Sequence, residues 1–262
     1  MNDLPVILCI GGHDPSGGAG IQADIETGVA LGCHVATAVA CLTVQDTQDV
    51  REIHPVDPGL VARQARVVLD DLPVRAVKVG LLGSAAVARS VAAVLATAPG
   101  IPVVLDPVLA AGGGRDLGGD PLILALRESL LPCATLLTPN SVELRRLAGQ
   151  QGVAEAVADL LALGCGAVLV TGGHDPGERL VSRLFRPGEP ERRFEVARLA
   201  GEFHGTGCTL ATATAAGLAT GRPLEDAIAA AHAYTGNAVA RAVPLGHGQW
   251  LLRRGGADAG PR

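Results

Sequence analysis

Residues 11–24 read Gly-Gly-His-Asp-Pro-Ser-Gly-Gly-Ala-Gly-Ile-Gln-Ala-Asp, and this stretch decides the fold. It follows an apolar run at residues 6–10 and precedes a segment that can continue as a helix. Five glycines within ten residues let backbone N–H groups approach a ligand closely, while Asp14 and Asp24 bring carboxylates to the strand-to-helix junction. Open α/β sheets bind small polar molecules at such junctions. A tight structural turn explains the glycines equally well, so the functional interpretation depends on a second motif.

That second motif lies near the other end of the chain, where residues 204–210 read His-Gly-Thr-Gly-Cys-Thr-Leu. The Ala-rich segment that follows predicts a long helix ending near residue 221. The first turn of a helix has unsatisfied N–H donors and the positive end of the helix dipole, which together attract phosphate. The chain has no GxxxxGK[ST] stretch and the first motif is not GxGxxG, so a P-loop or nicotinamide enzyme is disfavoured.

Short apolar runs alternate with helix-length segments along most of the chain. This pattern predicts βαβ units and a three-layer α/β/α fold with a mostly parallel central sheet. Hydrophobic residues make up 48% of the chain but aromatic residues only 2%, so Ala, Val and Leu must build the core. Strands are expected near 5–10, 35–43, 75–79, 101–105, 134–138 and 167–171, and helices near 18–31, 58–71, 84–97, 120–130, 151–164, 206–220 and 223–242. Residues 178–197 alternate polar and apolar side chains, which predicts an antiparallel hairpin at one edge.

Length and charge limit the domain organisation and the partners. The 262 residues contain no Pro/Ser-rich linker, which predicts one domain over residues 1–254 and a frayed tail at 255–262. A net charge of −5 with scattered arginines disfavours nucleic acid as a partner, and no long apolar run indicates a membrane segment. Six cysteines without a CxxC pair are typical of the reducing cytoplasm, so we expect a cytoplasmic protein.

Lys78 is the only lysine of the chain. Any ammonium contact to a phosphate must therefore come from Lys78, or its place must be taken by arginine, a metal ion or backbone N–H groups.

Polar and glycine-rich stretches follow each of the predicted strands. Because the carboxyl ends of parallel strands meet at one edge of the sheet, these stretches predict a ligand site there, although each alone is ordinary loop chemistry. After the second to sixth strands they are residues 43–47, 80–83, 106–114, 138–143 and 171–175.

Together these motifs resemble the hydroxymethylpyrimidine and phosphomethylpyrimidine kinases of thiamine biosynthesis, which are members of the ribokinase-like superfamily. The markers occur in family order: DPSGGAGIQAD at 14–24, LTVQDT at 42–47, VKVGLLG at 77–83, VLDPV at 104–108, LLTPNSVE at 136–143, GGH at 172–174 and HGTGCTL at 204–210. The resemblance implies ATP-dependent phosphorylation of 4-amino-5-hydroxymethyl-2-methylpyrimidine and then of its monophosphate. It also implies a ribokinase-like fold, a mobile lid near residues 109–119 and a homodimer.

The resemblance assigns roles around the transferred phosphoryl group. It makes Gly205, Thr206 and Gly207 the anion hole. It makes Cys208 the base, because Cys208 occupies the position at which most ribokinase-like enzymes have an aspartate base. A helix N-terminus favours a thiolate, so we expect Cys208 to accept the hydroxymethyl proton. The alternative is that Cys208 only packs beneath the anion hole.

The nucleotide and metal residues follow from the superfamily's NxxE pattern at Asn140 and Glu143. The resemblance implies that this pair orients the triphosphate and that Glu143, with Asp106, holds Mg²⁺ through water. The alternative for the pair is an N-cap and its third helical position, and both roles can hold together. Asp106 follows a strand end at the expected switch point and alternatively caps its loop. Thr171 is also assigned to the nucleotide site.

Gln45 is the strongest candidate for recognising the pyrimidine, because an amide offers a donor and an acceptor in one plane. The resemblance places apolar walls at Ala19, Leu81 and Val108, and Gly11 beside the substrate. Asp24 either approaches the substrate or is a helix-start carboxylate.

The chain departs from the family where the family usually has positive charge. Glu26 replaces a frequent lysine, Thr171 replaces the lysine that commonly precedes Gly-Gly-His, and the lid contains no lysine. These losses place the second phosphorylation in question, and Arg115 in the lid is the candidate that compensates.

Two other functions compete with the pyrimidine kinase. Pyridoxal also presents a hydroxymethyl group on a nitrogen heterocycle, so pyridoxal kinase is the alternative enzyme. Some pyridoxal-active relatives pair the cysteine of HGTGC with one in the lid, whereas residues 108–120 contain none here. A non-catalytic pyrimidine-binding protein is the second alternative, and the intact set of Asn140, Glu143 and residues 205–208 disfavours it.

Overall fold

The computed structural model describes residues 4–110, 117–149, 152–173 and 177–255. Its strands are β1 (Val6–His13), β2 (His34–Gln45), β3 (Val50–Pro55), β4 (Val74–Val79), β5 (Val103–Leu105), β6 (Leu136–Leu137), β7 (Val168–Val170), β8 (Arg179–Phe185), β9 (Arg192–Ala197), β10 (Phe203–His204) and β11 (Trp250–Leu251). Its α-helices are α1 (Gly20–Ala30), α2 (Pro58–Asp71), α3 (Ala85–Leu95), α4 (Gly119–Ala125), α5 (Ser141–Ala148), α6 (Val153–Ala162), α7 (Thr206–Ala219) and α8 (Leu224–Ala240).

Nine strands form the main sheet in the order β3-β2-β1-β4-β5-β6-β7-β8-β9. The six neighbouring strands β2, β1, β4, β5, β6 and β7 run parallel, which confirms the predicted sheet. Strand β8 pairs with β9 as the predicted antiparallel edge hairpin. The opposite edge also ends in an antiparallel strand, β3, which the sequence did not indicate. The chain reverses its direction of progress across the sheet between β1 and β4, so the topological switch point lies between these two strands. Asp106 was expected at the switch point, but it follows the next strand, β5.

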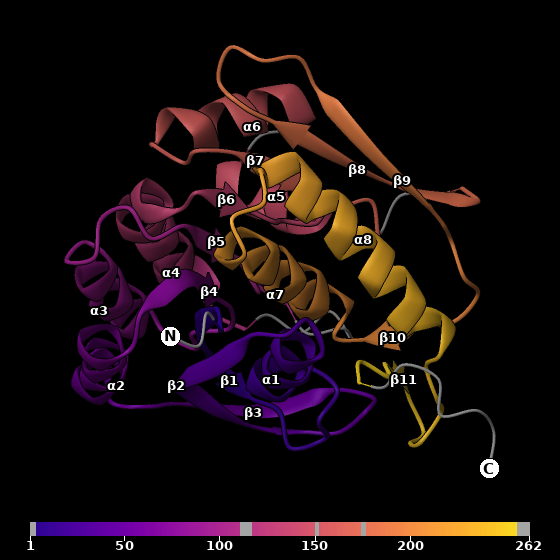
Figure 1. Cartoon of the computed structure of the whole chain (residues 1–262), viewed down its shortest axis with the longest axis horizontal. Coiled ribbons are helices and arrows are strands. Elements are labelled where there is room, and N and C mark those ends of the chain that lie inside the picture. Colours follow the sequence, from indigo (N-terminus) through magenta and orange to yellow (C-terminus); the bar gives the residue numbers. More distant parts are fainter. Residues whose placement is uncertain (1–3, 111–116, 150–151, 174–176, 256–262) are drawn as a thin grey trace.

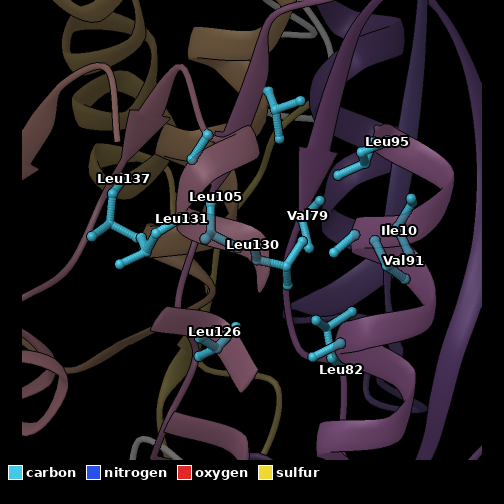
Figure 2. Close-up of a cluster of buried hydrophobic side chains, with 14 of the residues drawn as sticks. Ile10, Val79, Leu82, Val91, Leu95, Leu105, Leu126, Leu130, Leu131 and Leu137 are labelled. Carbon is cyan, nitrogen blue, oxygen red and sulfur yellow. The ribbon is translucent and has the colours of Figure 1, made fainter. Parts of the chain in front are cut away.

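Helices cover both faces of the sheet, as predicted. Helices α2 to α6 pack on one face, where side chains such as Ile10, Val79, Leu105 and Leu137 form the larger apolar cluster (Figure 2). Helices α1, α7 and α8 cover the other face, and α7 and α8 lie side by side across the sheet (Figure 1). The aliphatic core expected from the composition is therefore divided into two layers by strands that are buried on both faces.

Local sequence explains where several helices begin. Asp57 caps α2 by accepting a hydrogen bond from the Leu60 backbone N–H, and Pro58 occupies the first helical position, which suits its fixed φ.

The expected helix at 120–130 is divided, because α4 ends at Ala125 and a π-helical turn, Leu126–Leu130, continues it. No helix among the described residues is long and apolar enough to cross a membrane.

Candidate active site

The two glycine-rich motifs lie against each other. Asp14 organises the first of them, since its carboxylate accepts hydrogen bonds from the backbone N–H groups of Ser16 and Ala19, both at 2.8 Å. The same carboxylate lies 2.8 Å from Nε2 of His204 in the second motif. Burial opposes ionisation of Asp14, but hydrogen bonds from His204 and Ser16 hold its pKa below the usual value. An ionised Asp14 therefore ties together two loops that are 190 residues apart in sequence.

Close backbone contact explains the glycines at this junction. A Cβ atom on Gly18 would lie 2.1 Å from the His204 ring, and one on Gly205 would lie 1.9 Å from the carbonyl oxygen of Gly18. Gly205 also has a φ of +81°, a left-handed conformation that disfavours other residues, and it is the N-cap of α7. A larger residue at either position would force the two loops apart.

Helix α7 begins at Thr206, where the sequence motif placed it. The backbone N–H groups of its first turn have no intrahelical acceptor, and the positive end of the helix dipole lies among them. Gly207 is exposed and Cys208 is partly buried, so the start of this helix remains accessible from solvent. These features are the ones that the anion hole predicted at residues 205–208 requires.

A buried ion pair lies beneath this site. Lys78 on β4 is 1% exposed and donates from Nζ to both carboxylate oxygens of Asp24 on α1, at 2.9 and 3.0 Å. Thr212 on α7 donates a further hydrogen bond of 2.7 Å to the same carboxylate. Lys78 is thus committed to a structural pair and not exposed for a phosphate, which corrects one option left open by the sequence. Asp24 is fully buried at the fifth position of α1, so it is not a helix-start carboxylate.

The thiol of Cys208 does not have the acidity expected from its helix position. Burial raises its pKa to about 12; Lys78 opposes this increase, while the charges of Asp106 and Asp24 add to it. The expectation of a thiolate is therefore wrong, because desolvation and two carboxylates outweigh the helix N-terminus and one ammonium group. Burial raises the pKa of Asp106, and the Cys208 thiol in turn lowers it, although burial dominates.

Asp106 and Glu143 form a buried pair of carboxyl groups. Burial raises the pKa of Asp106 to about 6 and that of Glu143 to about 8, and the charge of Asp106 contributes to the second shift. The Oδ2 atom of Asp106 is buried and has no hydrogen-bond partner among the described residues.

Mg²⁺ fits this pair. The ion prefers oxygen ligands, and it usually takes only one or two carboxylates, with water and substrate phosphates completing its coordination. The unpartnered Oδ2 atom of Asp106 and the repulsion between the two carboxyl groups are what a cation would relieve. No larger group of metal-ligating side chains occurs in the part of the chain that the structure describes.

Asn140 and Glu143 form a capping box at the start of α5, which is the alternative that the sequence left open beside a nucleotide-binding role. The Asn140 side chain accepts from the backbone N–H of Glu143 at 2.9 Å, and Glu143 accepts from the backbone N–H of Asn140 at 3.0 Å. Thr171 lies beside them in a parallel bridge to Asn140, and its N–H donates to the Pro139 carbonyl. Both roles can still hold together, because the charge of Asp106 acts on the Glu143 carboxyl group.

The residues predicted to hold the pyrimidine lie at neighbouring strand ends. Gln45 ends β2, where it is partly buried and donates a hydrogen bond of 2.6 Å to Thr43. The predicted apolar walls are all partly buried and follow β1, β4 and β5; they are Ala19, Leu81 and Val108. Gly11 is buried within β1, close to the backbone of Gly80.

Arg115 and most of the predicted lid lie outside the described residues. The two ends of the lid are joined, since the backbone N–H of Leu117 donates to the carbonyl of Leu109 at 3.0 Å. The pairing of Asp14 with His204 and the position of Arg254, described below, were missed. Only the Asp-Pro-Ser turn and the histidine that begins the second motif gave a signal for the first of these.

Comparison with known proteins gives a consistent result. The family model described as phosphomethylpyrimidine kinase matches residues 14–253. The hydroxymethylpyrimidine/phosphomethylpyrimidine kinase of Streptomyces coelicolor is 38% identical over 250 residues, which cover 93% of this chain and 92% of that protein. The thiamine biosynthesis bifunctional protein ThiED of Geobacter sulfurreducens is 42% identical over 248 residues and 92% of this chain, which spans half of that longer protein.

Among solved structures, an ADP complex of Bacillus subtilis pyridoxal kinase has a TM-score of 0.86 and 30% sequence identity, covering 96% of this chain and 97% of that one. The ribokinase-like fold is therefore confirmed.

Proposed function

Because the chain belongs to the phosphomethylpyrimidine kinase family, we propose that it transfers the γ-phosphoryl group of ATP to the hydroxymethyl group of the aminopyrimidine precursor of thiamine. The monophosphate of that pyrimidine is the second acceptor. The observation that carries this proposal is the contact between the two glycine motifs, which joins the start of α7 to the loop after β1, where Ala19, one of the predicted pyrimidine walls, lies.

The chemistry needs little beyond positioning and charge neutralisation, because phosphoryl transfer passes through a loose transition state. The N–H groups of residues 205–208 receive the transferred phosphoryl group, and Asn140 with Thr171 orients the rest of the triphosphate. When bound, Mg²⁺ would be held by Asp106 and Glu143 and would supply positive charge to the phosphate oxygens. Cys208 must first lose its own proton, because burial raises the pKa of its thiol to about 12; the thiolate then accepts the hydroxymethyl proton as the new O–P bond forms and ADP leaves.

Pyridoxal kinase remains the competing activity, because the neighbouring solved structure carries that name at 30% identity. One relative at 42% identity is named a thiamine biosynthesis bifunctional protein instead, and one at 38% is named a hydroxymethylpyrimidine/phosphomethylpyrimidine kinase. The lid segment 108–120 also contains no cysteine to pair with Cys208. Both observations favour the pyrimidine over pyridoxal as the phosphoryl acceptor. A non-catalytic binding protein is disfavoured by the preserved groups at Cys208, Asp106 and Glu143.

Replacement of Gln45 tests the pyrimidine site. We expect Gln45→Leu to weaken pyrimidine binding by about 1–3 kcal/mol, because a buried polar edge of the ring loses its partner. ATP binding should be unchanged, since the nucleotide residues lie on other strand ends. Isothermal titration of each ligand measures both effects. Gln48→Leu, at an exposed position in the loop after β2, is the matched control. Unchanged pyrimidine affinity in Gln45→Leu would remove Gln45 from the site.

A further inference from the structure

Arg254 is a buried arginine that no motif indicated. It follows β11 near the end of the described chain and is only 2% exposed, whereas its neighbour Arg253 is exposed. The Tyr234 hydroxyl donates a hydrogen bond of 2.8 Å to the Arg254 carbonyl and so fixes its backbone to α8. A guanidinium group is costly to bury unless most of its donors are paired, so its contacts should show why it lies there.

The guanidinium group contacts three separate elements. Nη2 donates to the carbonyl of Gly18 in the loop after β1, and Nη1 lies 3.2 Å from the Glu26 carboxylate on α1. Nε donates to the Thr209 hydroxyl in the first turn of α7, at 2.8 Å. The Glu26 contact gives a role to the acidic residue that stands where the family frequently has a lysine.

The contacts continue directly to the anion-hole loop. The Thr209 hydroxyl that accepts from Arg254 donates in turn to the carbonyl of Gly205, at 2.7 Å. A Cβ atom on Gly205 would lie 1.9 Å from the Gly18 oxygen and 2.6 Å from Nη2 of Arg254. Arg254 therefore contacts the loop after β1 directly and the anion-hole loop through Thr209, at a point where the two loops touch each other.

We propose that Arg254 is a positioning residue that sets the spacing between the two glycine-rich loops, and with it the spacing of the acceptor hydroxyl and the transferred phosphoryl group. It touches neither reacting group. Its planar group with five donors holds acceptors from three elements at once, which a lysine ammonium on a flexible stem cannot do. This inference rests on the proposed kinase function. If the protein is that kinase, loss of Arg254 should lower the rate, because misplacing the reacting groups by about 1 Å can cost on the order of 100-fold in rate.

The test compares Arg254→Ala with Arg253→Ala, a matched control at the exposed neighbouring position. We expect Arg254→Ala to lower kcat at least about tenfold while KM for ATP and for the pyrimidine stays within about threefold, because binding groups remain and only alignment is lost. Arg253→Ala should match the wild type. Millimolar guanidinium chloride should restore part of the kcat of Arg254→Ala and have no such effect on Arg253→Ala.

Four further results decide the proposal. Arg254→Lys, which keeps the charge, should remain impaired, and it replaces the alanine variant if that variant does not fold. A kcat within about twofold of the wild type, or a loss carried entirely by KM, would overturn the proposal. If the wild type lacks kinase activity, the proposed function fails separately. Hydrogen exchange then decides: Arg254→Ala must speed exchange at residues 16–19 and 205–209, and unchanged exchange rejects the spacing role.

Discussion

Replacing Cys208 by alanine should lower kcat by at least about 100-fold, which is the scale for loss of a positioned base. The backbone N–H groups at the start of α7 remain in the variant, so ATP and the pyrimidine should still bind. Steady-state kinetics at saturating Mg-ATP, with titration calorimetry for both ligands, measure these two expectations. The expected loss lies in turnover because Cys208 is the residue of the 205–208 stretch whose side chain, as a thiolate, can accept the proton.

Cys133→Ala is the matched control, since Cys133 is also a partly exposed free cysteine but lies after the π-helical turn, away from the site. It should keep the wild-type kcat. A near-wild-type kcat in Cys208→Ala would leave Cys208 as a packing residue beneath the anion hole, and the proton would then have to leave by another route.

The second large effect concerns stability. Lys78→Met should lower the free energy of unfolding by about 3–5 kcal/mol, because it leaves the Asp24 carboxylate buried with the Thr212 hydroxyl as its one remaining hydrogen-bond partner among the described residues. Urea unfolding followed by circular dichroism measures the change. The loss is large because both side chains of the pair are nearly fully buried, so solvent cannot replace the missing ammonium.

Two variants control this experiment. Arg179→Met removes one partner of the exposed pair with Glu195 and should cost less than about 1 kcal/mol. The double variant Asp24→Asn/Lys78→Met removes the buried charge as well and should recover most of the loss of Lys78→Met. If Lys78→Met stays within about 1 kcal/mol of the wild type, Asp24 is not held as a buried carboxylate.

Local patterns in the sequence predicted most of the framework. The apolar runs and their spacing indicate the parallel strands, and the Asn140 to Glu143 spacing indicates a capping box because both of its hydrogen bonds lie within one helical turn. Strand β3 was missed because four of its six residues are exposed and it pairs only at an edge, so it has no apolar run to mark it.

The parts of the site that depend on distant residues could not be predicted in the same way. Asp24 and Lys78 are 54 residues apart, and Arg254 is 236 residues from Gly18. No periodicity connects such positions. The prediction of a thiolate at Cys208 was wrong for the same reason. The helix N-terminus that would lower the thiol pKa can be predicted from the sequence, but the burial and the two carboxylates that raise this pKa come from tertiary packing.

The comparison of acceptors tests the proposed function most directly. Steady-state kinetics at saturating Mg-ATP should be measured with hydroxymethylpyrimidine, with its monophosphate and with pyridoxal. We expect kcat/KM for a pyrimidine acceptor to exceed that for pyridoxal by at least about tenfold, which needs roughly 1.4 kcal/mol of differential transition-state binding. Gln45 and the cysteine-free lid are the features that favour this preference. Pyridoxal as the preferred acceptor would contradict the assignment of this chain to thiamine biosynthesis.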